Sequence, residues 1–253
     1  MPDVCDERDG FFEGFGVQLS ARSGTLPGMT ELVRLEEACR STLGDPQGLK
    51  LLGDYGYPEG LALCVIDSVQ STGVKYKSVR NVVDRYTNYR HQQSGDPERD
   101  GTIELLKTFA DLGDPEGWSK TIGNANRTFS RSWAPLKAEA VFDCTTVLHD
   151  AGITTTAALR SGEAELATVR EAWRSVSGQK SGVTWHYLLM LAGMPGVKPD
   201  RMILRFVSHA LGVRPHQLRH DQVVCLVSDA AERLGLSATE LDHAIWQYER
   251  RRR

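Results

Sequence analysis

The sequence predicts an all-α protein. Apolar residues recur three and four positions apart along about ten segments, which is the period of an amphipathic helix. Glycine or proline ends many of these segments, and none alternates apolar and polar residues as a half-buried strand would. Because the connections are also short, we expect packed helices and no sheet.

The first half of the chain opens with residues 1–28, which are rich in glycine, lack periodicity and are expected to form an irregular arm. Helices are then predicted from Thr30 to Leu43 before Gly44, from Pro58 to about Ser71, from Tyr76 to a polar loop that begins at His91, and from Ile103 to Gly113. A segment rich in glycine and asparagine follows, so we expect no regular element there.

The second half repeats the helical period more regularly. Helices are predicted over residues 138–148, 166–173, 183–192, 200–211 and 220–234. The last helix should begin at Ser237-Ala-Thr-Glu240, which has the form of a capping box.

Composition bounds the class of protein. The chain has 253 residues, of which 40% are hydrophobic and 25% charged, as is usual for a soluble domain. The apolar run Tyr187–Ala192 is too short to cross a membrane, and we expect no secretion signal at the acidic N-terminus. Five widely spaced cysteines fit neither a disulfide framework nor a zinc site, so we expect reduced thiols and a cytoplasmic protein.

The formal net charge of −3 counts mildly against nucleic acid as a partner, although a basic face can exist on an acidic protein. The tail Arg250–Arg253 has two interpretations. It is either a solvated helix end favoured by the helix dipole or a contact to phosphate.

Polar groups stand at helix ends in three separate segments. Gln70 ends an apolar helix, where it either caps and meets solvent or hydrogen-bonds to a base. Asp200 precedes an apolar helix, as an N-cap or as a reactive carboxylate, and the two roles are compatible. A tight turn between two helices is either only a turn or a phosphate site, and it consists of Ser177, Gly178, Gln179, Lys180, Ser181 and Gly182.

Together with the segment Leu136–Val141, these segments resemble motifs of the helix-hairpin-helix (endonuclease III-like) DNA glycosylase superfamily. Ser68-Val-Gln-Ser-Thr-Gly73 is similar to its Ser-Ala-Gln helix end, and Leu136-Lys-Ala-Glu-Ala-Val141 to the Lys-Ala helix before its hairpin. Residues 177–182 resemble the hairpin, and Val197–Ile203 the motif of the catalytic Asp. The four segments occur along the chain in the same order as the motifs of the family, and the resemblance covers about residues 55–210.

The resemblance implies a two-lobed fold with a cleft between the lobes. Residues 58–182 would form the central lobe that ends in the hairpin, and residues 29–57 plus 183–253 the second lobe with the catalytic carboxylate of Asp200. The hairpin would bind the DNA backbone and a monovalent cation, and Gln70 would fill the space left by the flipped nucleotide.

Departures from the family pattern narrow the expected chemistry. Ser181 or Gly182 stands where bifunctional members carry a lysine, so we expect a monofunctional enzyme. Lys180 lies close by, inside the hairpin, and lyase activity through it is the less favoured alternative. No iron–sulfur cluster or other metal is expected, because only Cys225 lies in the cluster region. Candidates for stacking on the base, each alternatively a core aromatic, are Trp118, Trp133, Trp185 and His186.

The expected function is therefore base excision from double-stranded DNA by a monomeric hydrolase. The base would be either damaged or alkylated, in DNA repair, or hypermodified, such as glucosylated hydroxymethylcytosine in phage DNA, in antiviral defence. For a bulky base, the segment from Gly113 to Ser132 would supply an open pocket. The competing hypothesis is a non-catalytic protein that binds DNA or another partner with the same fold.

Overall fold

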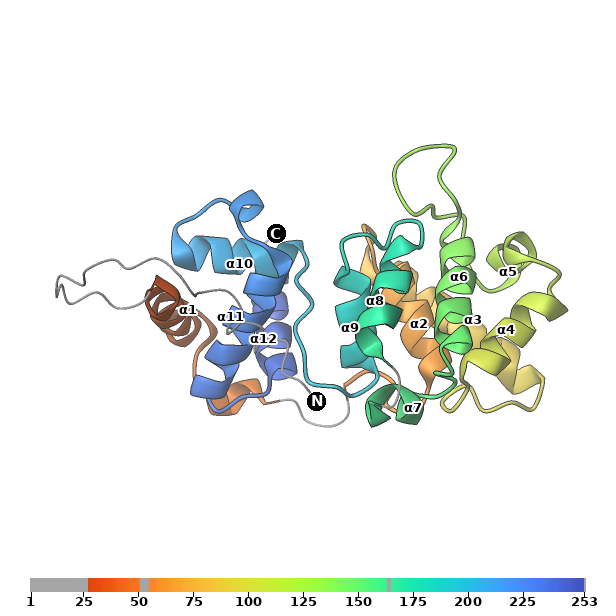
Figure 1. The fold of residues 1–253 in the computed structure, drawn as a ribbon, viewed down its shortest axis with the longest axis horizontal. Coiled ribbons are helices and arrows are strands. Elements are labelled where there is room, and N and C mark those ends of the chain that lie inside the picture. The colour runs from red at the N-terminus through yellow and green to blue at the C-terminus, as the bar shows by residue number, and fades with distance from the viewer. Residues whose placement is uncertain (1–26, 51–54, 163–164, 253) are drawn as a thin grey trace, which may run out of the picture. The chain divides into compact units, whose positions relative to one another are not determined.

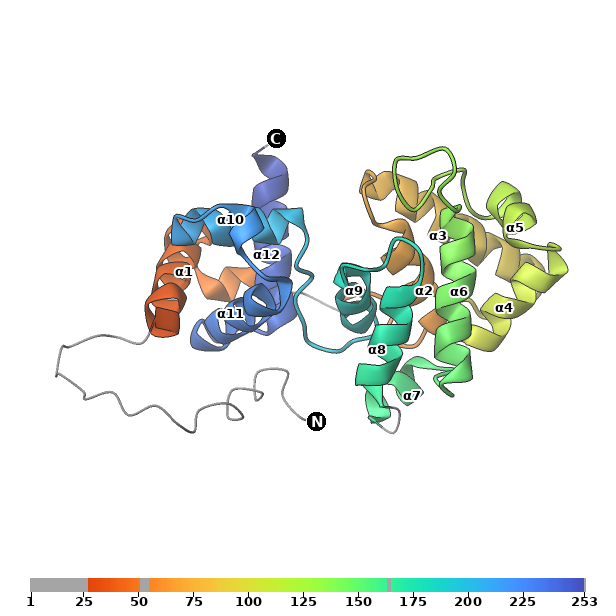
Figure 2. The same ribbon diagram turned by 45° about the horizontal axis from the view of Figure 1, so that its top comes forward.

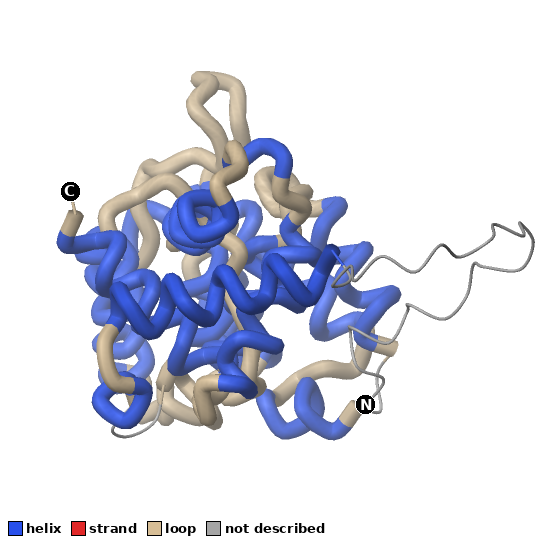
Figure 3. The backbone as a smooth tube through the Cα atoms, turned by 90° about the vertical axis from the view of Figure 1, so that its left-hand side faces the viewer, coloured by secondary structure: helices blue, strands red, loops and turns tan. Residues whose placement is uncertain are grey.

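The computed structural model describes residues 27–50, 55–162 and 165–252, with side chains described from residue 30 onward. Within these ranges the chain forms twelve α-helices and two 3-10 helices. Figure 3 draws helices joined by loops, and the described residues contain no strand, only one isolated bridge between Arg127 and Leu136. The all-α prediction is confirmed. The predicted arm lies almost entirely outside the described residues, and its last two positions, 27 and 28, already belong to the first helix.

The chain divides into two compact units (Figure 1). The terminal unit combines residues 1–50 with 199–253, and the central unit comprises residues 51–198. The helices of the terminal unit are α1 (Pro27–Leu43), η1 (Pro46–Leu49), α10 (Arg201–Leu211), η2 (Pro215–Gln217), α11 (His220–Arg233) and α12 (Ala238–Arg251).

In the central unit, α2 is the innermost helix. The unit contains α2 (Leu61–Gln70), α3 (Tyr76–Gln92), α4 (Thr102–Asp111), α5 (Pro115–Thr121), α6 (Lys137–Asp150), α7 (Thr156–Ser161), α8 (Leu166–Ser175) and α9 (Val183–Leu191). All ten residues of α2 are buried, and the helix packs against α3, α6 and α9. Helices α4 and α5 lie against α6 (Figure 2). An apolar helix that is covered on every side therefore organises this unit.

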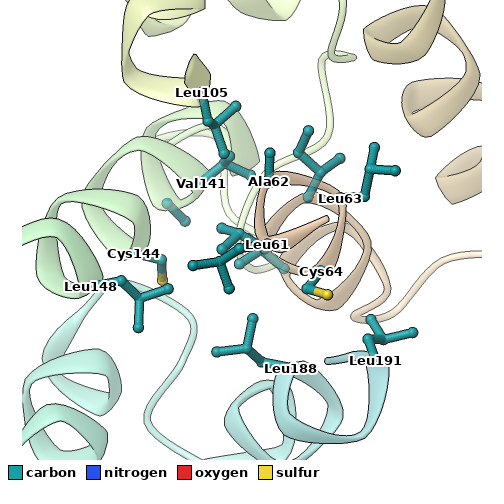
Figure 4. Close-up of a cluster of buried hydrophobic side chains, with 14 of the residues drawn as sticks. Leu61, Ala62, Leu63, Cys64, Leu105, Val141, Cys144, Leu148, Leu188 and Leu191 are labelled. Carbon is teal, nitrogen blue, oxygen red and sulfur yellow. The ribbon is translucent and has the colours of Figure 1, made fainter. Parts of the chain in front are cut away.

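The core of the central unit joins segments far apart in the sequence. Leu61 of α2 is completely buried, with Leu148 of α6 and Leu188 of α9 in the same cluster (Figure 4). Each large apolar side chain in such a cluster stabilises the fold by about 1.5–3 kcal/mol relative to an exposed position.

The boundary between the units differs from the lobes expected from the sequence. Residues 183–198 were expected in the second lobe, but α9 packs on α2, and Leu191 accepts a 2.7 Å hydrogen bond from the backbone N–H of Tyr57. The segment before α2 is thereby fixed to α9, and both belong to the central unit. Burial of the apolar residues of α9 sets this boundary after Lys198 instead of after Gly182.

Two short helices, α5 and α7, were not predicted. Each begins at a side-chain cap, since Asp114 accepts from the N–H of Gly117 at 2.7 Å and Thr155 from that of Ala158 at 3.1 Å. Seven and six residues are too few to display a helical period.

Side-chain contacts fix both ends of α12 in the terminal unit. The predicted capping box of α12 is confirmed: Ser237 Oγ accepts from the N–H of Glu240 at 3.2 Å, and Glu240 Oε2 accepts from the N–H of Ser237 at 2.7 Å. The Arg250 guanidinium lies 5.1 Å from the ring centre of Trp246, and Arg252 lies 5.5 Å from that of Tyr248. Both guanidinium groups therefore lie over aromatic rings of α12.

Truncation of the α2 core provides a test of this architecture. Leu61→Ala should lower the free energy of unfolding by about 2–5 kcal/mol, because it removes buried methyl groups and leaves a cavity. Ile103→Ala on α4, where the side chain is 55% exposed, is the matched control and should change it by about 0.5 kcal/mol or less. Urea unfolding followed by the fluorescence of the tryptophans measures both, and equal effects would contradict the assigned core.

Candidate functional site

Three segments of the central unit meet at one end of it. They are the C-terminal end of α2, the hairpin of residues 176–182 between α8 and α9, and the connection of residues 122–136 between α5 and α6, which projects beyond the helices (Figures 1 and 3). Asn124 Nδ2 donates to Gln70 Oε1 at 3.3 Å. The hydroxyl groups of Thr128 and Ser177 lie 3.2 Å apart. The connection thus bridges the Gln70 segment and the hairpin.

The hairpin depends on glycine at two positions, as predicted. Gly178 and Gly182 have φ of +81° and +74°, a region that favours glycine. A Cβ atom on Gly178 would lie 2.8 Å from Thr128 Cβ, so the hairpin and the connection are in close contact. The N–H of Gln179 donates to the carbonyl of Val176 and that of Gly182 to Gln179, at 3.0 and 2.9 Å.

The inner side of the hairpin is a buried hydrogen-bond chain. Trp173 Nε1 donates to Thr184 Oγ1 at 3.0 Å, and this hydroxyl donates to Gln179 Oε1 at 2.6 Å. Gln179 Nε2 in turn donates to the carbonyl of Ser177 at 3.2 Å. The side chain of Gln179, a predicted DNA contact, therefore supports the hairpin from inside.

The outer side of the hairpin has the character of an anion site. Lys180 and Ser181 are exposed, and α9 begins directly behind them, where its first N–H groups lack acceptors within the helix. Arg174 Nε donates to the carbonyl of Lys180 at 3.1 Å. Because a guanidinium group already lies at this carbonyl, the residues do not fit the monovalent cation that the resemblance implies.

Gln70 does not project toward solvent. Its side chain is 1% exposed, and Asn124 holds its Oε1. Asn124 is oriented in turn, because its Oδ1 accepts from the N–H of Asn126 at 2.9 Å. Gln70 Nε2 is buried and has no hydrogen-bond partner. The expected space-filling role requires a projecting side chain, and in this structure Gln70 is inside the unit.

Sequence reasoning missed a buried carboxylate one turn earlier on α2. Asp67 is 0% exposed, and its Oδ2 accepts from the hydroxyls of Tyr57 and Tyr76 at 3.0 and 3.1 Å. Its Oδ1 has no partner. Burial raises the pKa of Asp67, while the charge of Lys198 and the tyrosine hydroxyls lower it in part. An aspartate in an apolar helix carries no spacing motif, so only the fold reveals it.

Two lysines lie at the same helix end. Lys198 Nζ donates to Ser71 Oγ at 3.0 Å and stands 3.5 Å from the ring centre of Tyr187. Lys137 is buried, and its Nζ donates to the carbonyls of Gln70 and Thr72 at 2.8 and 2.6 Å. Burial, and then the charge of Lys198, lower the pKa of Lys137 to about 8. Lys137 was expected only as part of a motif, and it caps the C-terminal carbonyls of α2.

The four candidates for stacking on a base differ in how far their side chains are exposed. Trp118 is stacked on Phe109 with ring centres 4.9 Å apart, and Trp185 lies edge-on to Trp173 at 5.7 Å. Both are buried and fill the core, which is the alternative that the sequence left open. His186 is half-buried on α9. Trp133 is 74% exposed on the projecting connection, so its ring is accessible to a ligand.

The projecting connection is ordered and basic. Its base is closed by the Arg127–Leu136 bridge and by a 3.0 Å bond from the N–H of Thr128 to the carbonyl of Pro135. Residues 122–136 contain two basic residues, Arg127 and Arg131, and no acidic residue. The connection therefore presents Trp133 and the exposed Arg131 next to the hairpin.

Asp200 caps α10 in the terminal unit, as one of its two expected roles requires. Its Oδ1 accepts from the N–H groups of Met202 and Ile203 at 2.7 and 3.3 Å. Its Oδ2 has no hydrogen-bond partner among the described residues. One carboxylate oxygen thus fixes the helix, and the other is available.

The described ranges contain no helix that is both long and apolar enough to cross a membrane. They also contain no group of three or more side chains suited to bind a metal ion.

Removal of the Lys137 charge should change the pH dependence of stability. The pKa of Lys137 in the folded chain, about 8, lies below its ordinary value of 10.5, so the unfolded chain binds more protons between these values. Stability from this group therefore rises with pH across that window. The margin of wild type over Lys137→Met should grow from about pH 7 to about pH 10. Urea unfolding at both pH values measures it, with Lys107→Met, at an exposed lysine of α4, as the control with a constant margin. A constant margin for Lys137→Met would contradict the low pKa.

Comparisons with known proteins place the chain in a family. No curated protein and no solved structure matches it. The profile of a family described as a domain of unknown function, DUF8548, matches residues 33–250. This range covers both units apart from residues 1–32 and 251–253 of the terminal unit. The chain therefore belongs to the DUF8548 family.

Proposed function

We propose that the protein is a monofunctional DNA glycosylase of helix-hairpin-helix type, which hydrolyses the N-glycosidic bond of a modified base and leaves an abasic site. The observation that carries the proposal is the hairpin, whose exposed Lys180 and helix N-terminus adjoin a basic connection with an exposed tryptophan. The two compact units correspond in this proposal to the two lobes of the glycosylase fold.

DNA binding is assigned to the outer side of the hairpin and to the connection. A phosphate would accept from the first N–H groups of α9 and from Lys180, whose side chain has no partner among the described residues. Arg131 would contact a neighbouring phosphate, and Trp133 would stack on a base. Flipping a base out of the stack leaves neighbouring bases for such a ring to cover.

The chemistry is assigned to Asp200. As the bond between the sugar C1′ and the base nitrogen breaks, its electron pair leaves with the base, and the sugar becomes cationic. The free Oδ2 of Asp200 would stabilise this cation or orient the water whose oxygen then bonds to C1′, while a proton of that water neutralises the departed base. Oδ1 holds the orientation through the helix N–H groups, whose dipole favours a negative charge.

Hydrolysis is favoured over a lyase reaction by the residues around the hairpin. Gly182 stands at the N-cap of α9, where no amine is available as a nucleophile. The backbone carbonyl of Lys180 is held by Arg174, while its side chain is exposed and is assigned to a phosphate. The modified base is either damaged or alkylated, as in DNA repair, or hypermodified, as in phage DNA.

A second candidate function is DNA binding without catalysis. It is favoured by the capping role of Asp200, because a carboxylate at this position stabilises α10 whether or not it reacts.

Exchange of the Asp200 carboxylate separates these two functions. Asp200→Asn should keep the cap, since asparagine caps as well as aspartate, but lower the rate of base release by about 10²–10⁴-fold. Asp114→Asn, at the N-cap of α5, is the matched control and should release bases at the wild-type rate. Chromatography of bases released from damaged, alkylated and phage DNA measures both. Full activity of Asp200→Asn would contradict the mechanism, and DNA binding by a wild type that releases no base would establish the second function.

Loss of the exposed indole should weaken DNA binding. Trp133→Ala is expected to raise the Kd for duplex DNA with one unpaired base at least about fivefold, because stacking of one base contributes about 1–3 kcal/mol. Ile103→Ala, an exposed apolar residue on α4, is the control and should leave the Kd unchanged. Fluorescence anisotropy of labelled DNA gives the Kd. An unchanged Kd for Trp133→Ala would remove the connection from the interface.

A further inference from the structure

Two polar side chains on one face of α2 each contain a buried atom without a partner. Asp67 and Gln70 are 0% and 1% exposed and stand three residues apart, which places them on the same face of the helix, about 4.5 Å apart along its axis. The unpartnered atoms are Asp67 Oδ1, an acceptor, and Gln70 Nε2, a donor. Each such atom destabilises a fold by about 1–3 kcal/mol, so their presence together calls for a reason other than stability.

The remaining atoms of both side chains are already fixed. Tyr57 and Tyr76 hold Asp67 Oδ2, and Asn124 holds Gln70 Oε1. The Gln70 amide cannot be turned around without loss of that bond, because Asn124 is itself oriented by the N–H of Asn126. Only the acceptor of Asp67 and the donor of Gln70 are open, in a fixed order along the helix.

Burial raises the pKa of the Asp67 carboxyl, whereas the charge of Lys198 and the hydroxyls of Tyr57, Tyr76 and Tyr187 oppose part of that rise. In the ionised form, Asp67 Oδ1 is an acceptor. Tyr76, which donates to Asp67, is the first residue of α3 and is 37% exposed.

We propose that Asp67 and Gln70 recognise the edge of the flipped base, and that this base carries an exocyclic amino group next to a ring acceptor. The proposal rests on the glycosylase function proposed above and names its substrate class. The amino group donates to Asp67 Oδ1, and the ring acceptor receives the N–H of Gln70. Cytosine-type bases and adenine have this edge, and carboxylates accept readily from the cytosine amino group. A keto group in the same place would oppose its lone pairs to the carboxylate.

The experiment compares pairs of bases that differ only at this edge, where an amino group and a ring acceptor are replaced by a keto group and a ring N–H. Duplexes carry 5-hydroxymethylcytosine or 5-hydroxymethyluracil at one position opposite an abasic site, which lowers the energy of flipping. A second pair carries adenine or hypoxanthine and distinguishes the two sources of the amino edge. Base release and the Kd are measured with the full-length protein. At least one amino base is expected to be released about tenfold or more faster than its keto counterpart and to be bound with a Kd about tenfold or more lower.

Variants of α2 test the residues. Asp67→Asn should reduce the amino-over-keto ratio to below about two or invert it, because its amide donates to a keto oxygen. Ser68→Ala is the matched control, because Ser68 is buried on the same helix and donates only to the carbonyl of Val65, so the ratio should stay at the wild-type value.

Each outcome decides a different point. If wild type releases keto and amino bases equally, or Asp67→Asn keeps the ratio, the recognition proposal is overturned while the glycosylase function stands. If no base is released from any of the four duplexes or from damaged, alkylated and phage DNA, the proposed function fails, and the recognition proposal fails with it. The wild-type ratio decides the question even if Asp67→Asn does not fold.

Discussion

The burial of α2 on every side is the constraint on which the central unit depends. A helix that is covered along its whole length cannot direct its last carbonyl groups to water, and these groups need partners inside the protein. Lys137 meets this need from the start of α6 by donating to the carbonyls of Gln70 and Thr72. The ammonium group must be desolvated to do so, which lowers its pKa. Packing of the central helix thus determines the electrostatics at its end.

The same end of the unit is held by contacts between distant segments. The connection between α5 and α6 contacts Gln70 through Asn124 and the hairpin through Thr128. The hairpin is supported from within by the chain from Trp173 through Thr184 to Gln179. A surface built this way is fixed before a ligand arrives, and little ordering entropy remains to be lost on binding.

Much of the fold could be predicted from local sequence. The longer helices have a clear apolar period, and Gly44, Asp200 and Ser237 mark helix ends by well-understood cap chemistry. The glycine conformations of the hairpin follow from the same rules. The short α5 and α7 were missed because six or seven residues give no period. The unit boundary was misplaced because the sequence does not say which neighbour α9 covers.

The candidate site was less predictable, because burial decides what a side chain can do. Gln70 and Trp185 occupy promising positions in the sequence, yet tertiary packing encloses both. Asp67 belongs to no spacing pattern, and Lys198 was noted only as a neighbour of Asp200 in its motif. Only the fold brings both near Tyr187 and the end of α2. Trp133 could be named from composition, but its exposure depends on how the connection projects.

The discontinuity of the terminal unit has a consequence during protein synthesis. The ribosome makes the chain from the N-terminus, so the central unit is complete before α10, α11 and α12 are synthesised. Helix α1 must remain without α10 and α11, its packing partners, throughout that interval. The central unit can therefore fold as the chain emerges, whereas the terminal unit closes only after release of its last helices. The side chains of Leu35 and Cys39 on α1, which are buried in the finished unit, lack their cover until then.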